Sequence, residues 1–91
     1  IGAQRLHELG LVNQVSQPDS ALADALALAE KLNARAPNAL ASIKELLNEA
    51  PQSTLASQLA AERDHFVRNL HHANAGIGIA AFLAKESPRY D

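Results

Sequence analysis

The sequence predicts an all-α fold of four to five short helices, on three observations. Alanine and leucine, both strong helix formers, supply 19 and 14 of the 91 residues. Prolines at Pro18, Pro37, Pro51 and Pro88 divide the chain into segments of helical length. Within these segments, apolar residues recur at spacings of three and four, which places them on one side of a helix.

Ahead of Pro18, the sequence predicts a short helix and a short extended segment. A helix over Ala3–Leu9 would end at Gly10, because glycine adopts the left-handed conformation of a helix C-cap without a side-chain clash. Apolar and polar residues then alternate well enough to predict an extended piece over Leu11–Val15. Gln17 and Pro18 end this piece.

A longer helix is predicted next, starting after Asp19 or Ser20, since either side chain can cap its free backbone amides. Pro37 ends this helix and begins the following one, because proline disfavours helix at the preceding residue and suits a first turn. The apolar stripe of the longer helix consists of Leu22, Leu26, Ala29 and Leu32.

Two further helices follow from the same signals. One runs from Pro37 to about Ala50 and is stopped by Pro51, and the next is capped by Ser53 or Thr54 and ends near His71. Both carry an apolar stripe, made of Leu40, Ile43 and Leu47 in the former and of Leu55, Leu59, Phe66 and Leu70 in the latter.

The last predicted helix covers about Ala75–Lys85, with Asn74 as its cap and Pro88 just beyond its end. Gly76 and Gly78 lie near its start, but two glycines there are too weak a signal for an anion site.

Composition and charge exclude several classes of protein. The net charge is −2 with both signs interspersed, whereas a nucleic-acid surface would show a basic stripe. No apolar run approaches the roughly 20 residues that span a bilayer, and nothing resembles a signal peptide, so we expect no membrane contact and a cytoplasmic location. The chain has no cysteine, which excludes disulfide and thiolate chemistry.

The predicted hydrophobic core is thin. Aromatic residues make up only 3% of the chain, and alanine buries little surface. Because the chain also begins at Ile1 and lacks methionine, we expect it to be a piece of a longer protein that depends on a partner. Its exposed apolar faces predict self-association.

The histidines do not predict a metal site. His65 follows Glu62 by three residues, a spacing that places both on one helix face, but di-metal bundles use two such motifs and two further carboxylates. His71 and His72 are adjacent and therefore point in different directions from a helix. We predict that all three are solvated surface residues and that the chain holds no metal.

No catalytic residue is predicted either. A general acid needs burial to raise its pKa, and no carboxylate here stands in an apolar run. Glu45 and Glu49 lie one turn apart on a face that looks exposed. The sequence also lacks a supported Ser-His-Asp set and a glycine-rich phosphate loop.

Lys85 and Phe82 are the candidate ligand-binding residues. A lysine in the last turn of a helix is ordinarily explained by the helix dipole, and the residues alone favour that explanation. The same lysine can also reach a phosphate as a point charge, while Phe82 offers a flat apolar face to an adenine ring.

Four segments, in order, resemble the enoyl-CoA hydratase/isomerase (crotonase) superfamily. Its A-x-x-A-x-x-x-G-L-V-x-x-V stretch is similar to AQRLHELGLVNQV at 3–15. Its alanine–leucine helix pair with an Ala-Pro break resembles ALADALALAEKLNARAPNALASIKELLNEA at 21–50, and its next helix resembles LASQLAAERDHF at 55–66. Its closing Ala-Phe-x-x-Lys pattern is similar to GIAAFLAKESPRY at 78–90.

The resemblance implies that residues 1–91 form the C-terminal helical domain of a crotonase-like fold, without the N-terminal catalytic core. The substrate of the whole enzyme would be an acyl-CoA thioester, with no tightly bound cofactor and no catalytic residue in this chain. The domain would build a homotrimer, often paired into a hexamer. Phe82 and Lys85 match the family residues that touch the nucleotide part of coenzyme A.

The chain departs from the family pattern at several positions. Asn74 and Ile77 replace the acidic pair of a helix capping box, and Leu6 replaces an alanine. Glu86 replaces the usual arginine after the terminal lysine, which weakens the positive potential there, whereas Tyr90 in place of phenylalanine is expected to change little. The alternative is a free-standing helical protein-interaction module whose apolar stripes dock partner helices.

Overall fold

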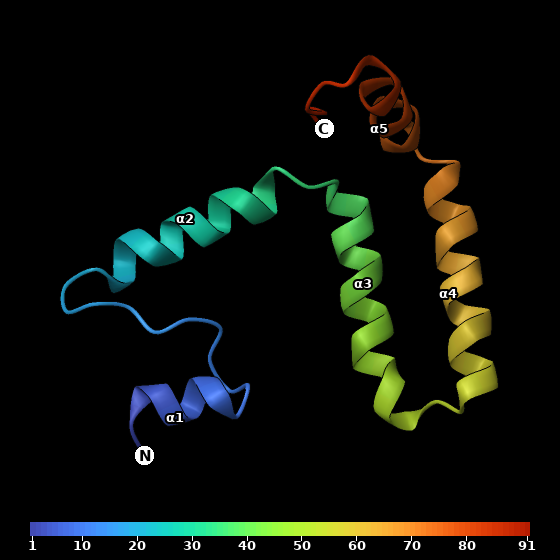
Figure 1. Ribbon diagram of the computed structural model, residues 1–91. Helices are drawn as coiled ribbons and strands as arrows, with labels where there is room; N and C mark the ends of the chain where they lie inside the picture. Colours follow the sequence, from blue (N-terminus) through green and yellow to red (C-terminus); the bar gives the residue numbers. More distant parts are fainter. The chain divides into compact units, whose positions relative to one another are not determined.

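The computed structural model describes all 91 residues and contains helices but no strand (Figure 1). The chain divides into two compact units, Ile1–Leu32 and Asn33–Asp91. None of the helices is both long and apolar enough to cross a membrane. The predicted all-α class is confirmed by five α-helices and one 3₁₀ turn: α1 (Ala3–Glu8), α2 (Ala21–Asn33), α3 (Pro37–Glu49), η1 (Ala50–Gln52), α4 (Leu55–Leu70) and α5 (Ala73–Ala84).

Helix α1 ends at the predicted glycine. Gly10 has a φ of 75°, in the left-handed region. Its N–H donates to the carbonyl of His7 at 2.9 Å, and the N–H of Leu11 donates to the carbonyl of Leu6 at 2.9 Å. This pair of bonds satisfies carbonyls that the helix end would otherwise leave free.

The predicted extended piece over Leu11–Val15 is wrong for this structure. The segment is a bend followed by irregular chain, and its large apolar side chains are exposed. A strand needs a neighbour to pair its alternate N–H and C=O groups, and the structure holds no other strand. The carbonyl of Val12 instead lies 3.2 Å from Nδ1 of His7.

Helix α2 begins directly after Ser20, whose carbonyl accepts the N–H of Asp24 at 3.0 Å. Asp19, the other predicted cap, has a φ of 65° and turns the chain into the helix. The apolar stripe of α2 is present, but Leu22 and Leu26 are exposed and no residue of the helix is buried.

Helices α3 and α4 pack side by side and run in opposite directions, joined at one end by η1 (Figure 1). Pro37 occupies the first turn of α3, as predicted. Thr54 caps α4, also as predicted, because its Oγ1 accepts the N–H of Ser57 at 3.1 Å.

The contact between α3 and α4 is polar. No hydrophobic side chain of the chain is buried, and the two buried residues are Ser42 and Asn74. The α4 side chains bonded or ion-paired to α3 are Gln58, His65, Arg68 and Asn69. The apolar residues Leu59, Phe66 and Leu70 each follow one of these by a single position, which rotates them by about 100° away from α3. The predicted stripe of α4 therefore faces outward and is exposed.

Helix α5 begins one residue earlier than Asn74, the predicted cap. The N-cap is His72, whose Nδ1 accepts the N–H of Asn74 at 3.0 Å. Asn74 thus lies inside the first turn of the helix, where its own side chain is free to bond elsewhere. The prediction of Asn74 as the cap is wrong, whereas His72 is exposed, as predicted, and also caps the helix.

Candidate functional site

The two candidate residues lie at the C-terminal end of α5. Phe82 is 82% exposed. Lys85 follows the helix in a left-handed conformation, with φ 58° and ψ 40°. The N–H of Lys85 donates to the carbonyl of Phe82 at 3.2 Å, and the N–H of Glu86 donates to the carbonyl of Ala81 at 2.9 Å. These are the same two bonds that close α1 at Gly10, but here a lysine occupies the glycine position.

The backbone of Lys85 is strained. A left-handed conformation costs a residue with a side chain roughly 1–2 kcal/mol, which glycine avoids. The ammonium group of Lys85 forms no ion pair within the chain, so no internal contact of the side chain offsets this cost. Such outliers concentrate at functional sites, where the side chain is needed in that position.

The segment Glu86–Asp91, which we name the strap, folds back beside α5 after the reversal at Lys85 (Figure 1). An open groove of about 540 Å³ separates parts of the strap from the helix, and it is lined by Ile77, Ala80, Ala81, Ala84, Glu86, Ser87, Pro88 and Arg89. The lining is mostly aliphatic, with Arg89 as its one cation.

The far end of the strap is bound to the start of α5. The Nδ2 group of Asn74 donates to the backbone oxygen of Asp91 at 3.1 Å, and Oδ1 of Asn74 accepts the Asp91 N–H at 3.4 Å. The ring of Tyr90 lies against Gly78, where a Cβ atom would come within 3.0 Å of the Tyr90 hydroxyl. The atom nearest to this Cβ position is thus the hydroxyl oxygen, the one atom that tyrosine adds to phenylalanine.

A chain of asparagine side chains connects α3, α4 and α5. Asn74, only 2% exposed, donates to Oδ1 of Asn38 at 2.8 Å. Asn38 donates to Oδ1 of Asn69 at 2.7 Å, and Asn69 donates to the Ser42 hydroxyl at 2.8 Å. Hydrogen bonds between amides shielded from water are directional, and Asn38 and Asn69 are half-buried, so this network defines which residues of the three helices face one another.

His65 is not the solvated residue that the sequence predicts. Its side chain is 12% exposed and lies between Glu45 of α3, at 3.6 Å from its Nε2, and Arg68, whose guanidinium donates to its Nδ1 at 2.6 Å. Glu62 takes no part in this contact. No group of three or more potential ligands is arranged to hold a metal ion.

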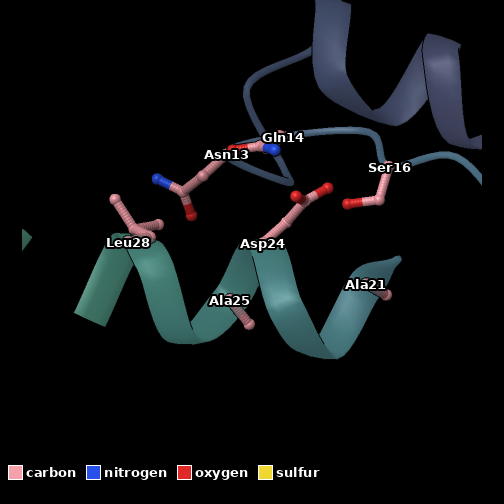
Figure 2. Close-up of a pocket in the computed structure, with 7 residues that line it drawn as sticks. All are labelled: Asn13, Gln14, Ser16, Ala21, Asp24, Ala25 and Leu28. Carbon is pink, nitrogen blue, oxygen red and sulfur yellow. The ribbon is translucent and has the colours of Figure 1, made fainter. Parts of the chain in front are cut away.

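Two smaller recesses lie elsewhere on the surface. One, of about 230 Å³, is lined by α3 and α4 side chains around Ser42, Glu45 and Arg68. The other, of about 240 Å³, lies in the first unit between the 13–16 loop and α2 (Figure 2). Figure 2 shows the Asp24 carboxylate pointing up toward Gln14 and Ser16. Each recess contains a serine and a carboxylate, and the one around Ser42 also contains His72. The Ser42 hydroxyl accepts a hydrogen bond from Asn69 and is not bonded to a histidine or carboxylate that could act as its base.

Sequence reasoning predicted Phe82 and Lys85, whose role stays a prediction, but it did not foresee the contacts made by Asn38, Asn69, Asn74, Gly78 and Tyr90. The sequence contained one signal of these contacts. Asparagine is a poor helix former, so an asparagine inside a helix indicates a stabilising contact of its side chain. Three of the missed residues are asparagines of α3, α4 and α5.

The family model described as enoyl-CoA hydratase/isomerase matches residues 1–91. The chain belongs to this family. Among curated relatives, the 1,2-epoxyphenylacetyl-CoA isomerase of Escherichia coli is 34% identical over 99% of this chain and 34% of its own length. The 2,3-dehydroadipyl-CoA hydratase of the same organism is 36% identical over 99% of this chain and 35% of its own length.

Solved structures of family members have the same helical arrangement. An enoyl-CoA hydratase from Polaromonas is 68% identical and superposes with a TM-score of 0.96 over 100% of this chain and 35% of its own. An enoyl-CoA hydratase from Mycobacterium tuberculosis is 34% identical, with a TM-score of 0.91 over 100% of this chain and 36% of its own. The chain thus spans about a third of the length of the relatives it matches, as expected of a piece of a longer crotonase-fold protein.

Proposed function

We propose that this chain is the C-terminal helical domain of an acyl-CoA-processing enzyme that acts as an enoyl-CoA hydratase or isomerase. The observation that carries the proposal is the family match over residues 1–91. It is supported by relatives whose names specify a CoA hydratase and a CoA isomerase, each about three times as long as this chain.

In this proposal, the rest of the enzyme performs the chemistry on an acyl-CoA substrate, and no tightly bound cofactor is required. Backbone amides polarise the thioester carbonyl and stabilise the negative charge that develops on its oxygen. A carboxylate of the same region moves the proton or activates water. The chain described above contributes binding and assembly, and it has no catalytic residue.

Phe82 and Lys85 are proposed to contact the nucleotide part of coenzyme A. The exposed Phe82 ring has a free face for the adenine ring, and the Lys85 ammonium has no partner in the chain and can pair with a phosphate. Glu86, directly after Lys85, lowers the positive potential at this point and so limits the strength of the phosphate contact.

The exposed apolar faces support assembly into a homotrimer, or a hexamer of paired trimers. Large apolar side chains remain exposed on α2, α3, α4 and α5, and faces of this kind normally lie against protein. The same faces suit a free-standing interaction module, but a family match along the whole chain favours the enzyme.

Kinetics of the whole enzyme test the coenzyme A contact. Lys85→Gln and Phe82→Ala should each raise KM for an acyl-CoA roughly threefold to tenfold, with kcat unchanged, since a lost ligand contact is worth about 1 kcal/mol. KM for the matching acyl-pantetheine, which lacks the nucleotide, should not change. Lys31→Gln, an exposed lysine of α2, is the matched control. Equal changes in KM for both substrates would contradict the contact.

The isolated 91-residue chain tests the proposed division of labour. It should show no hydration of crotonyl-CoA above the background rate, because the groups that act on the thioester lie outside it. Measurable turnover by the purified chain would overturn this part of the proposal.

A further inference from the structure

The left-handed conformation of Lys85 lies between two attached segments of chain. On one side, α5 ends with the bond from the Glu86 N–H to the carbonyl of Ala81 at 2.9 Å. On the other side, the strap is bound at Asp91, five residues further on. Lys85 is the residue at which the chain reverses, so its backbone cannot relax to a right-handed conformation without moving the strap.

The first attachment of the strap is the Asn74 amide. Its side chain donates to the Asp91 backbone oxygen at 3.1 Å and accepts the Asp91 N–H at 3.4 Å. The remaining Nδ2 hydrogen donates to Asn38 at 2.8 Å, so the amide is itself held in place by α3. With 2% of its surface exposed, Asn74 is shielded from water that would compete for these bonds.

The second attachment is the Tyr90 ring. It lies on Gly78, and a Cβ atom at that position would approach the ring at 3.0 Å from the hydroxyl oxygen and 3.7 Å from the nearest ring carbon. Glycine in the middle of a helix lowers helix stability by about 1 kcal/mol relative to alanine. At Gly78 the absence of a Cβ atom leaves room for the Tyr90 hydroxyl, so the helix has its weaker residue at the point where the strap packs.

We infer that Asn74, Gly78 and Tyr90 are positioning residues for the coenzyme A contact: by fixing the far end of the strap, they hold Lys85 in its left-handed conformation and so direct its ammonium group. The residue type at position 85 supports this. A glycine there would form the same helix end without strain, so a lysine is explained by a use for its side chain. The inference rests on the proposed function, because it names what positions the proposed contact.

Three substitutions in the whole enzyme test the inference. Tyr90→Ala removes the ring, and Gly78→Ala places a methyl group 3.0 Å from the Tyr90 hydroxyl oxygen, so that the side chain must shift, while strengthening α5 itself. Tyr90→Phe keeps the ring, and because the hydroxyl has no hydrogen-bond partner in the chain, it serves as the conservative variant. Asn48→Ala, an exposed asparagine of α3, is the neutral control.

Two measurements are made on each variant. Hydrogen exchange of the peptide covering 85–91 reports the attachment of the strap, and KM for an acyl-CoA against its acyl-pantetheine reports the nucleotide contact. Tyr90→Ala and Gly78→Ala should speed exchange in this peptide and raise KM for acyl-CoA alone by roughly threefold, with kcat unchanged. Tyr90→Phe should behave like the unaltered enzyme in both measurements.

The outcomes separate this inference from the proposed function. Unchanged KM in Tyr90→Ala and Gly78→Ala, alongside a raised KM in Lys85→Gln, would overturn the inference and leave the coenzyme A contact intact. Unchanged KM in Lys85→Gln itself would overturn the contact, and the positioning role of the strap in binding would fall with it. Unchanged exchange in Tyr90→Ala would show that the ring does not attach the strap and would also overturn the inference.

Discussion

The two compact units of the chain differ in what holds their helices. In Ile1–Leu32, side-chain hydrogen bonds join residues three and five positions apart, as in Arg5–Glu8 and His7–Val12. In Asn33–Asp91, local bonds of this kind are accompanied by others that join residues 12 to 36 positions apart, most of them through Asn69 and Asn74. The first unit is therefore stabilised by local contacts, whereas the second has an arrangement specified by distant polar pairs.

Neither unit buries a hydrophobic side chain, so hydrophobic burial does not explain the difference between them. Apolar burial is non-directional and is the usual main source of stability. In the second unit, the asparagine network specifies the relative orientation of the helices without such burial, because each amide bonds only in a defined geometry. The apolar faces of α3, α4 and α5 consequently stay exposed while the three helices keep one mutual arrangement.

Among the substitutions considered, Asn74→Ala is expected to destabilise the second unit most. The substitution leaves Oδ1 of Asn38 without its donor and both backbone groups of Asp91 without partners. The free energy of unfolding should fall by about 2–3 kcal/mol, because a buried hydrogen-bonding group is left unpaired. Urea unfolding followed by circular dichroism measures this, with Asn48→Ala as control. A loss no larger than the control's would refute the directing role of the network.

The stability of the first unit should instead depend on backbone conformation, because its side-chain hydrogen bonds are local. Gly10→Ala places a side chain at φ 75° and should lower the free energy of unfolding by about 1 kcal/mol. Gly2→Ala is the matched control, since Gly2 has an ordinary φ of −74° and open space around its Cβ position. Hydrogen exchange should rise over α1 and stay unchanged over α3, α4 and α5. Faster exchange in those helices would show that the units are coupled.

Lys85→Gly places a glycine at the end of α5, as at the end of α1, so that the two helix ends can be compared directly. The free energy of unfolding should rise by about 0.5–1 kcal/mol, since glycine relieves the left-handed strain at some cost in chain entropy. KM for acyl-CoA should rise as in Lys85→Gln. Thermal unfolding and steady-state kinetics on one preparation measure both quantities. A destabilised variant would show that the conformation of Lys85 is not strained.

The smallest effect is expected for Glu45→Gln, which removes the carboxylate beside His65 and Arg68. The side chains of Glu45 and Arg68 are 59% and 65% exposed, so this pairing should contribute less than about 0.5 kcal/mol and vanish at high salt. Glu49→Gln, an exposed glutamate of α3, is the control. A loss above 1 kcal/mol in urea unfolding at low salt would place this pairing alongside the asparagine network.

Local signals in the sequence determined the helices of this protein. As predicted, helices begin at Pro37 and after Thr54, and α1 is closed by Gly10. A missing N–H, a hydroxyl cap and a left-handed glycine each act within one turn. The family resemblance likewise depended on short ordered motifs, and the match over residues 1–91 confirms it. Candidate residues Phe82 and Lys85 came from the same motifs, and their contact with coenzyme A stays a prediction.

The tertiary structure alone decided which faces meet. Helical periodicity predicts a stripe on α4 but not that Asn69, one position before Leu70, is the residue that turns toward α3. It also cannot predict that Asn74 leaves the cap to His72 and binds the strap, or that Lys85 becomes left-handed. The physical reason is range: caps and breakers act between neighbours in sequence, whereas the bonds of Asn69 and Asn74 to other segments join residues 17 to 36 positions apart and form only when the chain has folded.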